Sequence, residues 1–406
     1  MQIHEYSKEK PNKKIFESAH LEGIRRVLQS KFMQMQVSQL RERSIISKGN
    51  KLVDFASCGY LGLDNDICEE DLALTKKFGL RNGWSRISGN TDLTRNLEVS
   101  LECNLGFRSV RLAQSISLIN YGIFYSLAQM FPVALYDRDV HITLKNGLRA
   151  AYRDEKSLLA WNNNDLVHLE RRLESLSPTI RKLIVVDGIY SMKGSFSPIK
   201  SIAKLAAQFN AVLVIDDAHG FGVLGENGFG VIDGLSPDEL KRIIYLGSFS
   251  KATSNPVAFV GCSDEIGDLL DSTAPFLIYS GPPSNFHTAI ALRQLEEFPK
   301  GVLTKKRELL LLASSDVHSF CASHNIAMFS SPESPIVVIK IFPEHFNEIV
   351  NRFYSYGIIG KGVVYPVVRK GDEAVRFTLT SSHTAEQIEL LKSAIYELKT
   401  LFKVRD

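Results

Sequence analysis

The sequence lacks the features that mark secreted, membrane-spanning and zinc-binding proteins. Its five cysteines are odd in number and scattered, and no CxxC pair occurs among them. This argues against a disulfide framework and a structural zinc site, and it favours a reducing compartment. Residues 1–14 are polar and charged, without the apolar core of a signal peptide. No apolar run approaches membrane-spanning length. We therefore expect a soluble, cytoplasmic protein.

An excess of charge of one sign is missing as well. The 48 Lys and Arg residues nearly balance 45 Asp and Glu residues, which gives a formal net charge of +3 over 406 residues. So small a charge does not indicate nucleic acid or a membrane surface as a partner. With 44% hydrophobic and 23% charged residues, the composition is that of an ordinary globular protein. The length suits one large domain with a smaller companion.

Ionisable residues follow two apolar runs in the middle of the chain. Residues 212–215 (VLVI) precede Asp216 and, three residues further, His219. Residues 243–246 (IIYL) precede a Gly-Ser-Phe-Ser-Lys segment that ends at Lys251. Both runs are typical of strands buried on two faces. Because ligands bind at the carboxyl ends of strands in open parallel sheets, the acid, the imidazole and the lysine are predicted to converge at one rim.

This combination suits pyridoxal phosphate chemistry. A lysine amine can hold the aldehyde as a Schiff base, and a carboxylate can pair with the pyridinium nitrogen so that the ring acts as an electron sink. Hydroxyls and helix-start N–H groups can bind the phosphate. Taken singly, Lys251 is more simply a solvated lysine and Asp216 a strand-end cap. The joint pattern favours a cofactor site.

A glycine-rich segment imitates a dinucleotide-binding fingerprint. Residues 220–225 (GFGVLG) match G-x-G-x-x-G and follow a strand. The fingerprint requires a helix to begin at the glycines. Here the chain continues through further glycines with loop composition and no helical period. We therefore reject a nicotinamide-binding interpretation.

Strand and helix patterns alternate from residue 112 to residue 271, which predicts a mostly parallel, doubly wound sheet. The clearest strands are expected at residues 183–186, 212–215, 243–246 and 257–260. A long helical stretch is expected to reach about His324, and the chain then changes to an α+β pattern. In that part, Thr384 with Gln387 predicts a capping box for the last helix.

We expect three parts in the chain. Residues 1–50 form an N-terminal helical arm, since apolar and basic residues alternate at helical spacing between residues 15 and 44. Residues 51–295 form a large cofactor-binding domain of the α/β class. Residues 296–406 form a small C-terminal α+β domain.

Seven motifs, in their order and spacing, carry a resemblance to a known family. They are SCGYLGL, GWSRISG, DRDVHITL, VVDGIYSMKGSFSPI, VIDDAHGFGVLGENGFG, GSFSKA and VRFTLTSSH. From about residue 52 to the C-terminus, the chain closely resembles the α-oxoamine synthases, fold-type-I pyridoxal-phosphate-dependent transferases. The resemblance implies pyridoxal 5'-phosphate as cofactor and a homodimer with shared active sites.

The resemblance also implies roles for residues around the cofactor. Lys251 matches the Schiff-base lysine, and Asp216 matches the partner of the pyridinium nitrogen. His219 matches a histidine that bonds the phenolic oxygen and acts as an acid during condensation. Ser191 is expected near the same oxygen, and His141 is expected to stack on the ring face.

Phosphate and substrate roles follow in the same way. Ser248 matches a phosphate-binding hydroxyl, and Asn120 with Tyr121 is expected to hold the phosphate through backbone N–H groups. Arg376 matches the arginine that clamps the amino-acid carboxylate, a task that suits a planar, bidentate guanidinium. Arg86 is expected near the acyl-donor entrance.

Some positions depart from the family pattern. Cys58 stands where most members have a substrate-contacting asparagine, and Asn120 stands where they have glycine. Lys193 occupies a position where an acid is common, and the loop at residues 279–283 is shorter than usual. These departures leave the bound amino acid open.

The reaction implied is a decarboxylative condensation of an α-amino acid with an acyl thioester, which releases CO2 and gives an α-aminoketone. The acyl carrier, coenzyme A or acyl carrier protein, stays open. Another reaction on the same cofactor, such as transamination or aldol-type cleavage, is an alternative. A third hypothesis is a catalytically weak partner subunit that keeps the fold, against which the intact Lys251, Asp216 and His219 argue.

Overall fold

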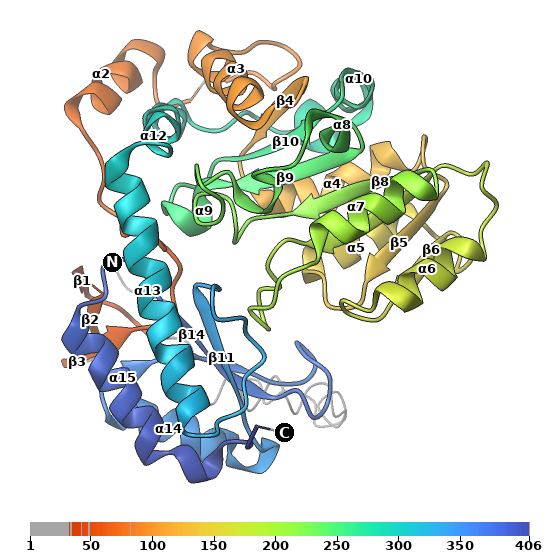
Figure 1. The fold of residues 1–406 in the computed structure, drawn as a ribbon. Helices are drawn as coiled ribbons and strands as arrows, with labels where there is room; N and C mark the ends of the chain where they lie inside the picture. Colours follow the sequence, from red (N-terminus) through yellow and green to blue (C-terminus); the bar gives the residue numbers. More distant parts are fainter. Residues whose placement is uncertain (1–31, 33–34, 42, 48, 82, 406) are drawn as a thin grey trace, which may run out of the picture.

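A seven-stranded sheet forms the centre of the larger half of the molecule (Figure 1). The computed structural model describes residues 32, 35–41, 43–47, 49–81 and 83–405. The sheet has the strand order β4-β10-β9-β8-β7-β5-β6. Its strands are β4 (Ser109–Ala113), β5 (Val133–Asp137), β6 (Leu158–Trp161), β7 (Lys182–Asp187), β8 (Ala211–Asp216), β9 (Ile243–Ser248) and β10 (Ala258–Cys262).

The sheet is mostly parallel, as the alternating sequence pattern predicts. β5 through β9 pair with one another only in parallel, whereas β10 runs antiparallel to both of its neighbours, β4 and β9. Every residue of β7, β9 and β10 is buried. Helices must therefore cover both faces, because a parallel sheet is stable only when neither face meets water.

Two hydrophobic clusters lie on opposite faces of this sheet. Within β7, Ile184 and Val186 belong to one cluster and Leu183 and Val185 to the other, as the alternation of strand side chains requires. The first face is covered by α3 (Asp92–Leu105), α6 (Leu166–Glu174), α7 (Ile199–Gln208) and α12 (Asn285–Glu297). The second is covered by α4 (Ile116–Leu127), α5 (Ile142–Ala151), α10 (Asp264–Thr273) and α11 (Pro275–Ile278). The remaining helices of this half are α2 (Glu69–Phe78), α8 (Pro237–Leu240) and α9 (Phe249–Ala252).

A smaller α+β half contains the C-terminal part of the chain. Its antiparallel sheet has the order β11-β14-β13, with β11 (Ile336–Lys340), β13 (Lys361–Val363) and β14 (Ala374–Thr378). Helices α14 (Phe346–Ser355) and α15 (Ala385–Glu397) pack on it. The capping box is confirmed, because Thr384 accepts the Gln387 N–H at 3.3 Å and Gln387 accepts the Thr384 N–H at 3.0 Å.

The long helix expected to end near His324 is two helices. α12 ends at Glu297, and α13 (Gly301–Ser323) begins three residues after Phe298. Pro299 explains the break, since proline has no N–H with which to continue the helical hydrogen bonds. In Figure 1, α13 runs from the larger half down along the smaller one.

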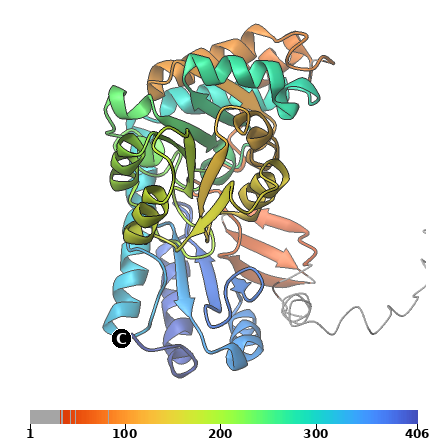
Figure 2. The same cartoon turned by 90° about the vertical axis from the view of Figure 1, so that its right-hand side faces the viewer.

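The segment at residues 39–54 differs from the expected helical arm. β1 (Gln39–Arg41), β2 (Ser44–Ser47) and β3 (Asn50–Asp54) form a sheet with β12 (Ile358–Ile359), so a helix up to residue 44 is wrong there. Residues 1–31, where most of the arm was expected, lie outside the described residues. Both views show these strands beside the C-terminal elements (Figures 1 and 2).

The expected boundary at residue 51 also moves. Leu52, Phe55, Tyr60 and Leu61 belong to the same hydrophobic cluster as the C-terminal sheet. We define residues 55–61 as the crossing segment, because its backbone also bonds to the larger half. The Gly59 and Tyr60 N–H groups both donate to the Lys251 carbonyl at 2.9 Å, while the Thr378 N–H donates to the Phe55 carbonyl at 2.6 Å.

The glycine-rich imitation of a nucleotide fingerprint is a loop. Residues 220–225 form turns and bends without a helix, and Gly222 and Gly225 adopt φ angles of 85° and 84°.

No helix in the described part of the chain has the length and apolarity needed to cross a bilayer. Over the same residues, no group of three or more His, Cys, Asp or Glu side chains could hold a metal ion.

The stability of the smaller half is expected to depend on pH through His383. Its ring stacks on Phe55 at 4.2 Å, its Nδ1 accepts the Thr380 N–H, and its Nε2 donates to the Asp54 carbonyl. Burial lowers the pKa of His383 to about 4, whereas an unfolded histidine titrates near pH 6.5. The unfolded chain therefore binds more protons between these two values, and stability falls as the pH is lowered from about 6.5 to about 4.

Urea midpoints measured between pH 7.5 and pH 4 test this. The variant His383→Gln should be less stable at pH 7.5 but should lose less stability on acidification, by about 2 kcal/mol. His345→Gln, at a partly exposed position on the surface of the same half, is the matched control. Equal pH slopes for all three proteins would contradict the assignment.

Candidate functional site

A cavity of about 410 Å³ lies where residues of the two halves meet. Its lining residues are Ala56, Ser57, Cys58, Ile116, Ser117, His141, Asp187, Ile189, Ser191, Met192, Asp216, Ala218, His219, Lys251, Lys361 and Arg376. Seven of the eleven residues named from the sequence as site candidates are among them. The carboxyl ends of β7, β8 and β9, the crossing segment and the strands β13 and β14 supply most of this wall.

Lys251 is carried by the short helix α9 directly after β9. Ser248 caps this helix, and its hydroxyl accepts the Ser250 N–H at 3.2 Å. The crossing segment holds the Lys251 carbonyl from the other side. Ser248 itself is fully buried and donates to the Ser250 hydroxyl at 2.9 Å, and it is not among the lining residues. Its part in phosphate binding stays a prediction.

Asp216 ends β8 with its carboxylate already held in place. One oxygen accepts a hydrogen bond from the Asn120 amide at 2.7 Å, and the other accepts the Ala218 N–H at 3.1 Å. The carboxylate is 6% exposed, and burial raises its pKa. A buried carboxylate of this kind is stabilised by a cation placed against it.

The sequence reasoning missed Asp187. This residue ends β7 and lies in register with Asp216, so two buried carboxylates stand side by side at the strand ends. Burial and then the neighbouring Asp216 raise the pKa of Asp187 well above its usual value. Its oxygens accept the His141 N–H at 3.1 and 3.2 Å. The signal was present in the motif VVDG, where a strand ends in an acid.

Two histidines in the cavity have lowered pKa values, which favour the neutral imidazole. His219 is 8% exposed, and its Nδ1 lies 2.6 Å from the hydroxyl of the fully buried Tyr60. Burial and the nearby cations, Lys251 first, hold the pKa of His219 well below its usual value. His141 caps α5 with its Nδ1 2.7 Å from the Thr143 hydroxyl, and burial lowers its pKa too. Ser191 lies on the same wall and is 8% exposed.

Asn120 and Tyr121 do not lie where a phosphate could use their N–H groups. Both sit inside α4, where backbone N–H groups bond to carbonyls of the preceding turn. The Asn120 side chain instead reaches Asp216, and Tyr121 is 51% exposed and does not line the cavity. The free N–H groups belong to the first turn of α4, and Ile116 and Ser117 of that turn do line it. This helix start, and not the backbone of Asn120 and Tyr121, offers free N–H groups to the cavity.

Arg376 is a buried cation without an acidic partner. It lies on β14, is 3% exposed, and forms no ion pair with any residue that the structure describes. Its Nε has no hydrogen-bond partner either. Cys58, half-buried, lines the cavity as well. The Arg376 guanidinium also lies within hydrogen-bond reach of Tyr60. A buried guanidinium with no acidic partner and an unpaired Nε fits a substrate carboxylate.

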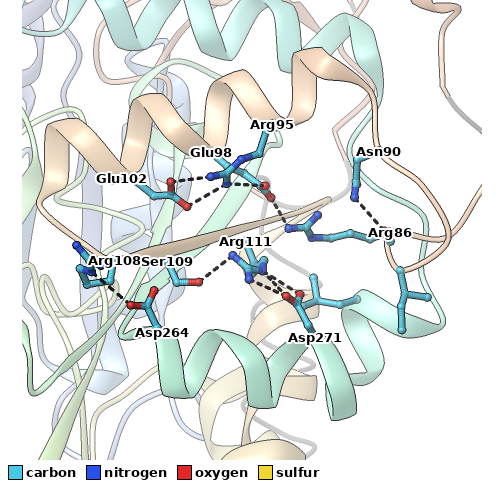
Figure 3. Close-up of a pocket in the computed structure, with 12 residues that line it drawn as sticks. Arg86, Asn90, Arg95, Glu98, Glu102, Arg108, Ser109, Arg111, Asp264 and Asp271 are labelled. Carbon is cyan, nitrogen blue, oxygen red and sulfur yellow. Dashed lines mark hydrogen bonds and ion pairs between the residues drawn. The ribbon is translucent and has the colours of Figure 1, made fainter.

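Arg86 lies in a different pocket, of about 540 Å³ (Figure 3). It is 8% exposed, and its guanidinium pairs with the buried Glu98 at 2.7 Å. Arg95 bonds Glu102, and Arg111 holds Asp271 through two nitrogens. Figure 3 shows each of these arginines directed at a carboxylate of its own pocket. Arg86 does not line the cavity of Lys251 in this chain, and its expected place beside the acyl donor stays a prediction.

Lys193 joins the two halves next to the cavity. Its ammonium lies 2.7 Å from Asp139, which precedes His141 by two residues, and 3.4 Å from Asp372 of the smaller half. Lys193, which departs from the family pattern, therefore pairs with one acid of each half.

Known proteins resemble this chain over most of its length. The model of the aminotransferase class I and II family matches residues 135–395. A putative 8-amino-7-oxononanoate synthase from Methanococcus vannielii is 30% identical over 88% of this chain and 94% of its own. A serine palmitoyltransferase from Bacteroides thetaiotaomicron is 28% identical over 88% of this chain and 89% of its own. The solved structure of a serine palmitoyltransferase from S. paucimobilis, with a PLP-myriocin adduct bound, superimposes with a TM-score of 0.81 at 20% identity, covering 90% of this chain and 93% of that one.

The ion pair of Arg86 and Glu98 is expected to act on stability and not on the cofactor site. Arg86→Met removes the nearer of the two cations that pair with the buried Glu98 and leaves only Arg95, at 3.7 Å. The change should lower the free energy of unfolding by about 3 kcal/mol. The double variant Arg86→Met with Glu98→Leu should recover most of that loss. Urea unfolding measures both, with Arg108→Met, an exposed arginine of the same pocket, as control. A double variant as unstable as the single one would contradict this role.

Proposed function

Because the chain belongs to the aminotransferase class I and II family and to its α-oxoamine synthase branch, we propose that it joins an α-amino acid to an acyl thioester with loss of CO2. The cofactor of this family is pyridoxal phosphate. One observation carries the proposal for this chain: Lys251, the strand-end Asp216 and Arg376, which has no acidic partner among the described residues, line the same cavity. A lysine, a carboxylate and a carboxylate-binding arginine are the three groups that the reaction requires of the protein.

The residues present fit the cofactor. Lys251 would hold its aldehyde, Asp216 its ring nitrogen, and the free N–H groups at the start of α4 its phosphate, with His141 beside the ring. The orphaned Nε of Arg376 leaves a place for the substrate carboxylate. When bound, pyridoxal phosphate supplies an electron sink for the carbon next to the amino group.

Asp216 acts by keeping a proton on the nitrogen that faces it. Its two hydrogen bonds, from Asn120 and Ala218, leave the carboxylate fixed, and its burial makes a facing positive charge strongly favourable. Asp187, beside it, accepts the backbone N–H of His141 and so fixes the start of α5. The buried Asp216 carboxylate therefore favours a protonated ring over a neutral one.

Lys251 and Arg376 act on the amino acid from two sides of the cavity. Arg376 binds the carboxylate and orients the α-carbon, and it releases that group as CO2 after the new carbon–carbon bond has formed. The free amine of Lys251 removes the α-proton and later returns a proton to the same carbon. The crossing segment fixes the backbone of Lys251, so both tasks start from one position.

His219 supplies a neutral imidazole to the acyl donor. Since its Nδ1 is hydrogen-bonded to the Tyr60 hydroxyl, Nε2 is the ring nitrogen left for contacts with a molecule in the cavity. We propose that this nitrogen hydrogen-bonds the thioester oxygen while the carbon–sulfur bond breaks.

We also propose that the chain works as a homodimer. Exposed aromatic residues gather around α4, α11 and the loop after α11, with Tyr121, Tyr125 and Tyr279 exposed by 51%, 62% and 85%. A groove of about 450 Å³ runs between them. Clustered exposed aromatic side chains mark an interaction surface, and a second copy of the chain is the occupant that the family favours.

The variant Lys251→Ala tests the reaction. Purified protein should release thiol from an acyl-CoA or acyl carrier protein only when an amino acid is present, and Lys251→Ala should lower that rate more than about 1,000-fold. Lys241→Ala, at an exposed position (74%), is the control. Absorbance changes with amino acid alone, leading to the amine form of the cofactor without any acyl donor, would favour an aminotransferase instead.

Arg376 is expected to set the affinity for the amino acid. Arg376→Met removes a charge-assisted pair and should raise the KM for the amino acid about 10- to 100-fold, with a smaller effect for Arg376→Lys. The KM for the acyl donor should change little. Arg352→Met, on the surface of α14, serves as control. An Arg376→Met protein with an unchanged KM for every amino acid would show that the carboxylate binds elsewhere.

A further inference from the structure

A second cation faces the cavity beside Arg376. Lys361, on β13, lies directly opposite Arg376 on β14 in the antiparallel register, and both residues line the cavity. Lys361 is accessible to solvent, while Arg376 is 3% exposed. The two cations therefore line one wall at different depths.

The surroundings of Lys361 offer no compensating acid. Among the described residues it takes part in no ion pair, and the two carboxylates of the cavity, Asp187 and Asp216, end strands of the other half. Partial burial and then the charge of Arg376 lower the pKa of Lys361. Lys251 acts in the same direction, and the Cys58 thiol acts against it. Like charges placed directly opposite in a sheet destabilise it. An arrangement of this kind is favourable only when an anion enters.

Charge balance indicates how many negative charges the bound substrate carries. The carboxylate that the proposed reaction places on Arg376 carries one negative charge, and it leaves the ammonium of Lys361 uncompensated. A substrate with a second acid group neutralises both cations. Because directly opposite residues have Cβ atoms about 5 Å apart, the two acid groups must be close together. An amino acid with an acidic side chain meets this condition, whereas the far end of an acyl chain does not.

We propose that Lys361 binds the side-chain acid of a dicarboxylic amino acid whose α-carboxylate is held by Arg376. The inference rests on the proposed function, since it concerns the same substrate site. It makes Lys361 the residue that selects among amino acids. Its charge also acts on His141 and His219, so it faces the part of the cavity where the substrate is held.

Absorbance titration of the cofactor-loaded protein, without acyl donor, tests the proposal. The probes are aspartate and glutamate, with asparagine, glutamine and alanine for comparison, because the amides keep the shape and lose the charge. The acids should bind at least about 10-fold tighter than their amides. Lys361→Met should weaken binding of the acids about 10- to 100-fold and leave the amides unchanged, while Lys361→Arg keeps the preference.

Controls separate this result from loss of fold and from failure of the proposed function. Lys370→Met, an exposed lysine beyond β13, should behave as wild type, and equal melting temperatures establish that Lys361→Met is folded. Amides that bind as tightly as the acids would overturn the proposal. So would a Lys361→Met protein altered only toward acyl donors that carry a terminal carboxylate. Preference for acids without any thiol release would instead contradict the proposed function and leave the role of Lys361 standing.

Discussion

The site depends on the hydrogen bonds that the crossing segment makes on both of its sides. Its backbone donates to the carbonyl of Lys251 in one half and pairs with the end of β14, next to Arg376, in the other. The lysine and the arginine come from domains with separate cores. Without this segment, nothing in the sheets themselves would fix the distance between them. The phenol of Tyr60, in the same segment, also fixes His219.

The two halves contribute ionisable side chains of opposite type to the cavity, so that a molecule bound there would contact acids on one side and cations on the other. The strand ends of the larger half carry two acids, and the sheet of the smaller half carries two cations. Each pair consists of like charges in register, which costs stability in the empty protein. The binding of a cationic ring on one side and an anionic substrate on the other removes both costs. Relief of the like-charge repulsion within each pair would therefore add to the affinity for the cofactor and the substrate.

Local pattern was enough to predict the large sheet, the capping box and the positions of Asp216, His219 and Lys251, because strand ends and turn residues determine them. It failed where a role depended on helix register. Asn120 and Tyr121 are only one turn beyond the free N–H groups of α4, and sequence does not show that turn. The ion pair of Arg86 with Glu98 could not be predicted, because it becomes visible only through packing. Asp187 and Lys361 act through a neighbouring strand, and the pairing of strands distant in sequence cannot be read from either one alone.

The break at Pro299 has a consequence for movement. α12 packs with the larger half, whereas α13 packs on α15 and β11 of the smaller one. Residues 298–300 and the crossing segment are two places where the chain passes between the halves. A rotation of the smaller half about these two places would move Lys361 and Arg376 together, within the limits that the hydrogen bonds of the crossing segment set. Such a rotation would change the width of the cavity without altering the strand pairing of either sheet.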